Sequence, residues 1–267
     1  MKNLAKKVVA ITGAAAGIGK EMALLFAAEK ASLALMDINE KQLEVTAGEL
    51  AGYGVTVRKY VCNVADKDKV EAVCAEIKRD FGFVDVLVNN AGIVVGKSIE
   101  DSSYEEIRRT IDVNLTGLIW LTKQFLPEMT RRNSGHIVNI ASAAGMLAIP
   151  LLGDYCATKF AVVGFTDALR MEMKKFGHAG VKTTCVCPSI IDTGMFTGFK
   201  PPLLNPLLQP KEVARRVVDA VKMEKTYVKM PFMVNLIPLF KFLPAPFVDW
   251  LGDILGTTRS MDHFKGH

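Results

Sequence analysis

The stretch from residue 7 to residue 19 reads KVVAITGAAAGIG and decides the fold of this chain. Its first part, residues 8–12, is a short apolar run rich in β-branched side chains, which predicts a buried strand. The second part is a turn containing Gly13, Gly17 and Gly19, and apolar residues at helical spacing follow it. The pattern predicts a strand that passes through a tight turn directly into a helix.

A glycine-rich turn between a strand and a helix is the setting in which dinucleotides bind. The missing side chains let the backbone approach a pyrophosphate, while the helix N-terminus supplies N–H groups and positive potential. Asp37 follows Gly19 by eighteen residues, close to the distance of about 20 at which an acidic residue bonds the adenosine ribose. Its carboxylate would repel a 2′-phosphate, and neither the turn nor Ile38 offers a basic residue, so NAD is favoured over NADP. The alternative is a structural turn followed by a helix-capping Asp.

Strand and helix patterns alternate outward from this turn. Further strands are expected at 32–37, 55–61, 84–89, 136–140, 181–187 and 227–230, and helices at 40–50, 67–81, 104–129, 155–176 and 211–223. This alternation predicts an α/β protein built from βαβ units, with a parallel sheet covered by helices on both faces. No linker or internal repeat divides the chain, so we expect a single domain over residues 1–267.

The cysteines and the N-terminus indicate a mature protein in a reducing, cytoplasmic setting. Five cysteines without a CxxC pair predict neither a disulfide framework nor a zinc site, and no metal is expected. Cys185 and Cys187 lie on an expected strand, and we assign them to opposite faces and to core packing. The basic residues 1–7 lead into a strand pattern rather than into a signal-peptide core.

The net charge of +5 is unevenly distributed, because residues 200–267 account for +4 of it. A basic and apolar C-terminal region favours a membrane surface or an anionic partner. Nucleic acid is not an expected partner, since Lys and Arg are not clustered with aromatic residues. An ordinary excess of surface lysine is the alternative.

Tyr155 and Lys159 lie four residues apart, so a helix would place both on one face. A tyrosine with a pKa of about 10 is a poor general base at neutral pH, and a fixed cation nearby favours its phenolate form. Ser142 precedes Tyr155 by thirteen residues and could hold an alcohol or carbonyl oxygen at the same place. The spacing alone also fits a solvated helix face.

These motifs together resemble the short-chain dehydrogenase/reductase family over residues 5 to about 230. The resemblance rests on the glycine turn TGxxxGIG at 12–19, NNAG at 89–92, PSIIDT at 188–193, and the ordered set Asn114, Ser142, Tyr155 and Lys159. It implies a Rossmann-type, doubly wound parallel sheet of about seven strands with helices on both faces. The cofactor cleft would lie at the carboxyl ends of the strands.

The resemblance also implies a role for each matching residue. Tyr155 would be the general acid/base, Lys159 would lower its pKa and hold the nicotinamide ribose, Ser142 would orient the substrate oxygen, and Asn114 would support a proton-carrying water chain. The implied cofactor-binding residues are Gly13, Ala15, Gly17, Ile18, Gly19, Asp37, Ile38, Asn63, Val64, Asn90, Ala91, Gly92, Tyr155, Lys159, Pro188, Ile191 and Thr193. Two positions depart from the family pattern: Asn63 stands where an Asp is common, and Ser189 where a Gly is common.

The segments outside this scaffold are apolar and predict a lipophilic substrate. A substrate lid is expected near 193–210 and an apolar C-terminal extension at 231–267, and the pocket residues would be Met146, Leu147, Ile149, Leu151, Leu152, Phe196, Phe199, Leu203 and Leu204. A steroid, retinoid or long-chain alcohol or ketone fits such a pocket. The tail SMDHFKG at 260–266 is similar to the ends of the retinol and 17β-hydroxysteroid dehydrogenase-like branch of the family.

The leading hypothesis is therefore an NAD-dependent oxidoreductase acting on a lipophilic alcohol or ketone. One alternative is an enzyme resembling 3-oxoacyl-carrier-protein reductase, which would usually favour NADPH, against Asp37. Another is a cofactor-binding protein of lipid surfaces without turnover. The extension would either touch a membrane peripherally or pack as a lid or interface, and the family resemblance implies a homodimer or homotetramer.

Overall fold

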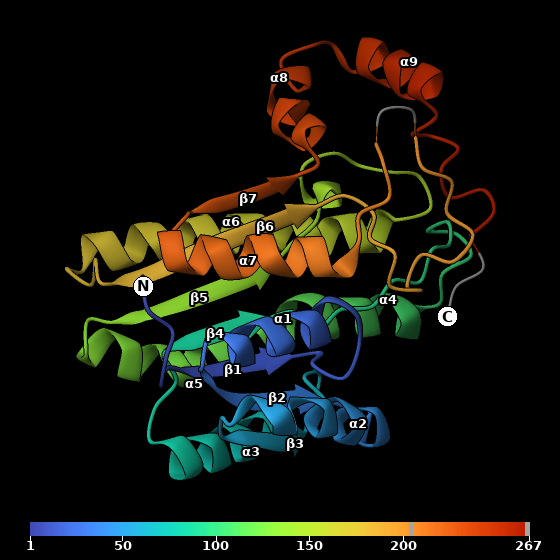
Figure 1. Cartoon of the computed structure of the whole chain (residues 1–267). Coiled ribbons are helices and arrows are strands. Elements are labelled where there is room, and N and C mark those ends of the chain that lie inside the picture. The colour runs from blue at the N-terminus through green and yellow to red at the C-terminus, as the bar shows by residue number, and fades with distance from the viewer. Residues whose placement is uncertain (203–204, 265–267) are drawn as a thin grey trace.

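The computed structural model describes residues 1–202 and 205–264, and its centre is one seven-stranded parallel sheet (Figure 1). The strand order is β3-β2-β1-β4-β5-β6-β7. The strands are β1 (Val8–Thr12), β2 (Ser32–Asp37), β3 (Val57–Val61), β4 (Val86–Asn89), β5 (Gly135–Ile140), β6 (Val181–Pro188) and β7 (Tyr227–Met230). The predicted doubly wound α/β fold is confirmed.

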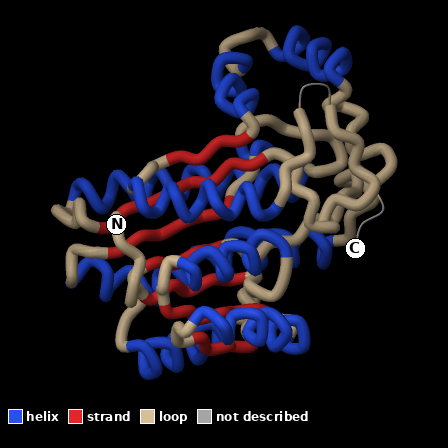
Figure 2. Tube along the Cα trace, in the orientation of Figure 1, coloured by secondary structure: helices blue, strands red, loops and turns tan. Residues whose placement is uncertain are grey.

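Helices cover both faces of the sheet (Figure 2). They are α1 (Gly17–Ala28), α2 (Glu40–Leu50), α3 (Lys67–Phe81), α4 (Tyr104–Ile111), α5 (Gly117–Arg131), α6 (Gly153–Lys175), α7 (Pro210–Met223), α8 (Ile237–Phe240) and α9 (Ala245–Leu255). Three of the helices begin at a side-chain cap, because Asn39, Asp66 and Ser103 each accept a backbone N–H of the first turn.

The alternating side chains of β1 show why its sequence is apolar throughout. Val9 and Ile11 pack in the cluster that contains residues of α1, α2 and α7, whereas Val8 and Ala10 pack in the cluster with α3, α5 and α6. Both faces of the strand are therefore buried, as is typical of parallel sheets.

The position of β1 places a ligand cleft next to the glycine turn. β1 pairs with β2 on one side and with β4 on the other, so the chain reverses its direction of winding between β1 and β4. Open α/β sheets bind ligands at such a switch point, outside the carboxyl ends of the strands. In Figure 1 the arrowheads of the strands point toward the side on which the long loops gather.

The extension after β7 contains two helices that the proline-rich sequence does not predict. It forms a 3-10 turn at Phe232–Leu236 and then α8 and α9, and Figure 1 shows α8 and α9 apart from the two helix layers. Proline stands in the first turn of α8 and of α9, where its missing N–H costs no intrahelical bond. Over the described residues, the helices are all too short or too polar to cross a membrane.

The assignment of Cys185 and Cys187 to opposite faces of a strand is wrong. Both side chains pack in the same cluster, and their Sγ atoms lie 3.7 Å apart. Successive side chains of a strand point to opposite faces, so residues two apart, such as Cys185 and Cys187, share a face. Their expected burial in the core is confirmed, as each is fully buried.

Candidate active site

The glycine turn is packed so closely that side chains cannot enter it. Gly13 and Gly17 have φ of +63° and +54°, in the left-handed region that favours glycine. A Cβ on Gly19 would lie 1.9 Å from the carbonyl oxygen of Gly13. Within the described part of the chain, α1 has no side-chain cap and no acidic residue in its first turn. An uncapped helix N-terminus beside a turn with glycine at three positions fits a pyrophosphate.

The carboxylate of Asp37 ties the end of β2 to this turn. Its Oδ2 accepts the N–H of Ala15 at 2.9 Å, and its Oδ1 accepts the N–H of Asn39 at 2.9 Å. Each carboxylate oxygen keeps acceptor capacity after one such bond. Asp37 also lines the cleft, so it can accept hydrogen bonds from ribose hydroxyls there.

Hydrogen bonds between Thr12 and Asn90 hold together the ends of β1 and β4, the two strands that flank the switch point. Thr12 Oγ1 accepts the N–H groups of Asn90 at 2.9 Å and Ala91 at 3.0 Å. In return, Asn90 Nδ2 donates to the carbonyl oxygens of Thr12 and Gly13. Thr12 was not among the predicted site residues. Thr12 is the last residue of an apolar strand and directly precedes Gly13, and this position could have identified it as a site residue.

Asn114 lies in a π-helical turn, Asp112–Thr116, between α4 and α5. Its Oδ1 accepts the N–H of Ile93 at 2.8 Å, and its Nδ2 donates to the carbonyl oxygen of Ile93 at 2.9 Å. A Cβ on Gly92 would lie 3.3 Å from Asn114 Oδ1 and 3.6 Å from Lys159 Nζ. Asn114 is thus fixed next to the loop at Gly92 and Ile93, which faces Lys159. Single π-helical turns are frequent at functional sites.

Tyr155 and Lys159 lie on the first turns of α6, and both are buried. Lys159 Nζ donates to the carbonyl oxygen of Ile140 at 2.9 Å and lies 5.4 Å from the centroid of the Tyr155 ring. Burial lowers the pKa of Lys159 to about 8. Burial also raises the pKa of Tyr155 to about 12, and the Ser142 hydroxyl acts in the opposite direction. The direction for Tyr155 is opposite to the expected one, because desolvation outweighs the other influences on the phenol in this structure.

Ser142 follows β5 and lines the same cleft as Tyr155 and Lys159. Its Oγ accepts the N–H of Ala144 at 3.1 Å and donates to the carbonyl oxygen of Pro188 at 3.4 Å. A single hydroxyl held by these two bonds still has acceptor capacity for a substrate.

The cleft beside the glycine turn has a volume of about 260 Å³ and is lined by most of the predicted cofactor residues. The structure brings together Gly13, Gly17, Ile18, Asp37, Asn90, Ala91, Gly92, Tyr155, Lys159, Pro188, Ile191 and Thr193 in its wall. Ala15, Gly19, Ile38, Asn63 and Val64 do not line it. The described residues hold no group of three or more His, Cys, Asp or Glu placed to bind a metal ion.

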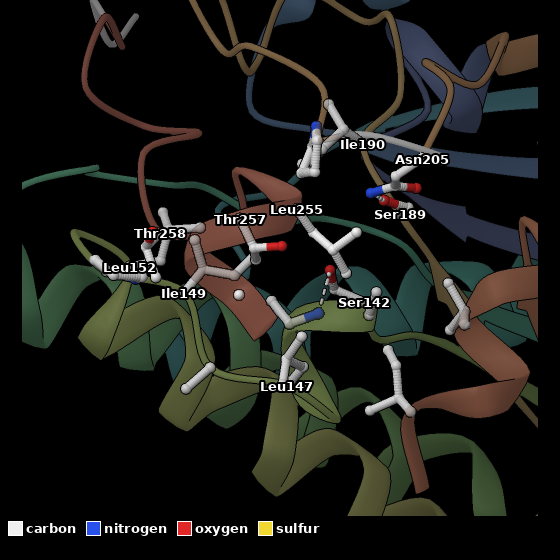
Figure 3. Close-up of a pocket in the computed structure, with 18 of the residues that line it drawn as sticks. Ser142, Leu147, Ile149, Leu152, Ser189, Ile190, Asn205, Leu255, Thr257 and Thr258 are labelled. Carbon is white, nitrogen blue, oxygen red and sulfur yellow. Dashed lines mark hydrogen bonds between the residues drawn. The ribbon is translucent and has the colours of Figure 1, made fainter. Parts of the chain in front are cut away.

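A second, apolar cavity of about 180 Å³ adjoins the cleft (Figure 3). Leu147, Ile149 and Leu152 form part of its wall, as predicted, together with Phe196 and Phe199. Met146 and Leu151 do not line it, and Leu203 and Leu204 lie outside the described residues.

The sequence indicated the extension as a segment that decides the substrate, but it did not identify which residues of the extension, or which polar pair, line this cavity. Side chains from α8 and α9 line it, among them Ile237, Phe240 and Leu255. Asn205 Nδ2 donates to Ser189 Oγ at 2.6 Å, and Figure 3 shows the two side chains next to each other. The contributions of α8 and α9 depend on a long-range fold-back that periodicity does not show.

The two cavities meet at the reacting groups. The residues that line both are Ser142, Tyr155, Ser189, Ile190 and Phe196. A group bound in the cleft and a group bound in the apolar cavity would therefore both reach the Tyr155 hydroxyl and the Ser142 hydroxyl. This is the arrangement required for a transfer between a cofactor and an apolar substrate.

Comparisons with known proteins agree with this geometry. A sequence model of short chain dehydrogenases matches residues 7–202. The human protein named epidermal retinol dehydrogenase 2 is 40% identical over 98% of this chain and 86% of its own length. Human 17-beta-hydroxysteroid dehydrogenase 13 is 39% identical over 91% of this chain and 81% of its own.

Two solved structures are similar to this fold. A short-chain dehydrogenase/reductase from Burkholderia phymatum, in complex with NAD, has a TM-score of 0.83 and 28% identity, covering 91% of this chain and 95% of its own. An alcohol dehydrogenase from Thermococcus sibiricus, complexed with 5-hydroxy-NADP, has a TM-score of 0.74 and 32% identity, covering 84% of this chain and 94% of its own. The chain therefore belongs to the short-chain dehydrogenase family and is an NAD(P)-dependent oxidoreductase.

Proposed function

We propose that this protein transfers a hydride between NAD and a lipophilic alcohol or ketone of the steroid, retinoid or long-chain type. The observation that carries this proposal is the meeting of the cleft beside the glycine turn and the apolar cavity at Ser142 and Tyr155. The names of the two human relatives, a retinol and a hydroxysteroid dehydrogenase, support the substrate class.

The residues of the cleft would hold the dinucleotide in one orientation. The turn at Gly13 and Gly17 would receive the pyrophosphate, Asp37 the adenosine ribose, and Lys159 the nicotinamide ribose. The bound nicotinamide supplies or accepts the hydride. Because Asp37 carries a negative charge where a 2′-phosphate would lie, NAD is the preferred cofactor.

Tyr155 would move the proton that accompanies the hydride. With a pKa of about 12 its phenol is protonated at neutral pH, which is the form that donates a proton to a carbonyl oxygen during reduction. The ammonium of Lys159, 5.4 Å from the ring centroid, would stabilise the phenolate left behind. Ser142 would orient the substrate oxygen, and Asn114 would support the path by which the proton is replaced.

Two alternatives remain distinguishable. An enzyme of the 3-oxoacyl-carrier-protein reductase kind would usually favour NADPH, which the carboxylate of Asp37 disfavours. A cofactor-binding protein without turnover would leave the Ser142 and Tyr155 hydroxyls without a function.

The test is a kinetic panel in which NAD and NADP are each paired with lipophilic and with short polar alcohols or ketones. We expect NAD with steroid, retinoid or long-chain substrates to give the highest kcat/KM. Higher activity on short polar alcohols would contradict the substrate class, and absence of turnover throughout the panel would favour the non-catalytic alternative.

We also propose that residues 193–210 form the substrate lid. A separate proposal is that the extension contacts a lipid surface. The extension exposes large apolar side chains, namely Phe232, Leu239, Phe242, Phe247, Trp250 and Ile254. Residues 231–264 carry two basic and three acidic side chains, so apolar contact rather than charge would drive binding.

Sedimentation with phosphatidylcholine vesicles tests the lipid contact. We expect the protein to co-sediment, and Phe242→Glu with Trp250→Glu to abolish this, while Met223→Glu, an exposed apolar position on α7, leaves it unchanged. Equal binding by all three proteins would contradict the proposal.

We further propose that the protein forms a homodimer or homotetramer that pairs through α5 and α6. Light scattering measures the mass in solution, and the mass of a monomer would contradict this proposal.

A further inference from the structure

The last described residues of the chain, 257–264, form a C-terminal strap that packs on the substrate loop, residues 193–202. The N–H of Lys200 in the loop donates to the carbonyl oxygen of Ser260 in the strap at 3.0 Å. Ser260 and Met261 are each only 1% exposed, although both lie outside regular helices and strands. The strap is therefore docked against the loop rather than lying free on the surface.

Two glycines leave the space that the strap occupies. A Cβ on Gly198, in the substrate loop, would lie 2.0 Å from the carbonyl oxygen of His263. A Cβ on Gly96, in the loop after β4, would lie 2.2 Å from the ring of Phe264. A Cβ atom does not approach another heavy atom this closely, so a side chain at position 198 would collide with the strap backbone and one at position 96 would displace the Phe264 ring.

A chain of aromatic rings connects the strap to Tyr155. The Phe264 ring centroid lies 6.3 Å from that of Phe196, and the Phe196 centroid lies 6.1 Å from that of Tyr155 in an edge-to-face arrangement of 84°. These separations are within the range in which aromatic pairs attract. Phe196 also lines both the cofactor cleft and the apolar cavity. The position of Phe196 thus determines how much room a substrate has beside the Tyr155 hydroxyl.

We propose that Phe264 is a positioning residue that holds Phe196 against Tyr155 and thereby sets the size of substrate that reaches the reacting groups. The inference rests on the proposed function, because it assigns the wall of the same substrate cavity. Phe264 acts through Phe196 rather than by touching the reacting atoms. Removing its ring frees Phe196 to move away from Tyr155, which enlarges the cavity beside Tyr155.

The test compares kcat/KM for a four-ring ketone with that for a single-ring cyclic ketone. In Phe264→Ala we expect this ratio to rise about three- to tenfold, the size of one lost aromatic contact, mainly through a higher KM for the single-ring ketone. Phe264→Leu, which restores apolar bulk, should recover most of the wild-type ratio. Tyr104→Ala is the matched control, because Tyr104 is also aromatic but is 94% exposed, and it should leave the ratio unchanged.

A double-mutant cycle separates positioning from general loosening of the fold. If Phe264 acts through Phe196, adding Phe264→Ala to Phe196→Ala changes the ratio no further. Additive effects, or an unchanged ratio in a folded Phe264→Ala, would overturn the proposal. Phe264→Val, a smaller truncation of the same side chain, must shift the ratio in the same direction, which keeps the test valid if Phe264→Ala does not fold. Failure of the proposed function would appear differently, as wild-type protein that turns over neither ketone.

Discussion

At the scale of single residues, burial has opposite effects on the two titrating groups of α6. It raises the pKa of Tyr155 to about 12 and lowers that of Lys159 to about 8, because a site with little water disfavours each charged form. The phenol of Tyr155 is consequently protonated at neutral pH in this structure, and positive charge near the ring would favour its phenolate form. The i, i+4 spacing in the sequence predicts the proximity of the two groups but not this balance.

Asp37 provides the residue-scale test of cofactor choice. Replacing Asp37 with Asn removes the charge but keeps an oxygen that can accept the Ala15 N–H. We expect the ratio of kcat/KM for NADP to that for NAD to rise by about tenfold or more, which corresponds to about 1.4 kcal/mol of lost discrimination.

The control for this change is Glu40→Gln, which removes one exposed negative charge at the start of α2, outside the cleft wall. It should leave the cofactor ratio unchanged. An Asp37→Asn variant that discriminates against NADP as strongly as the wild type would show that the carboxylate does not select the cofactor.

At the scale of elements, the inner strand β5 contains a buried histidine that links stability to pH. Thr184 donates its hydroxyl proton to the carbonyl oxygen of Lys225, so its Oγ1 must accept from Nε2–H of His136, 2.7 Å away. Within the described residues, His136 Nδ1 is buried without a hydrogen-bond partner. Burial lowers the pKa of His136 to about 4.

This pKa predicts a loss of stability between about pH 6.5 and pH 4. In that window the unfolded chain binds a proton at His136 while the folded protein does not, so the free energy of unfolding falls as the pH falls. The full loss is about 3 kcal/mol. His136→Gln should flatten this part of the profile in urea unfolding measured from pH 7 to pH 4, because the amide does not titrate.

His178→Gln, at a partly exposed position, is the comparison for the same measurement. It should keep the wild-type slope. If His136→Gln and the wild type lose stability in parallel over this window, His136 is not the group responsible.

The elements that the sequence predicted best are those with strong local patterns. The run at 8–12 is apolar because β1 is buried on both faces, and periodicity detects such strands and their helices within a few residues. The π-turn that holds Asn114 and the helices α8 and α9 were not predicted. A π-turn differs from the surrounding helix only in its hydrogen bonds, and the prolines of the extension obscure helical spacing.

At the scale of the whole molecule, the site depends on contacts between segments far apart in the chain. The family motifs predicted the cleft residues, and the structure collects twelve of them in one wall. The substrate cavity was only partly predictable, because Phe240 and Leu255 reach it by the folding back of the extension toward Ser142 and Tyr155. Ser189 and Asn205 are paired across sixteen residues, a contact that a single sequence does not reveal.

The central claim is that Tyr155, at the junction of the cleft and the apolar cavity, carries the proton of the reaction. The most direct measurement is kcat of Tyr155→Phe with NAD or NADH and a lipophilic substrate, with NAD affinity measured by calorimetry and Tyr104→Phe, at a 94% exposed position, as the control. We expect kcat to fall by about 10²- to 10⁴-fold in Tyr155→Phe, the usual contribution of a general acid/base, while NAD still binds and Tyr104→Phe keeps wild-type activity. Full activity in Tyr155→Phe would contradict the account.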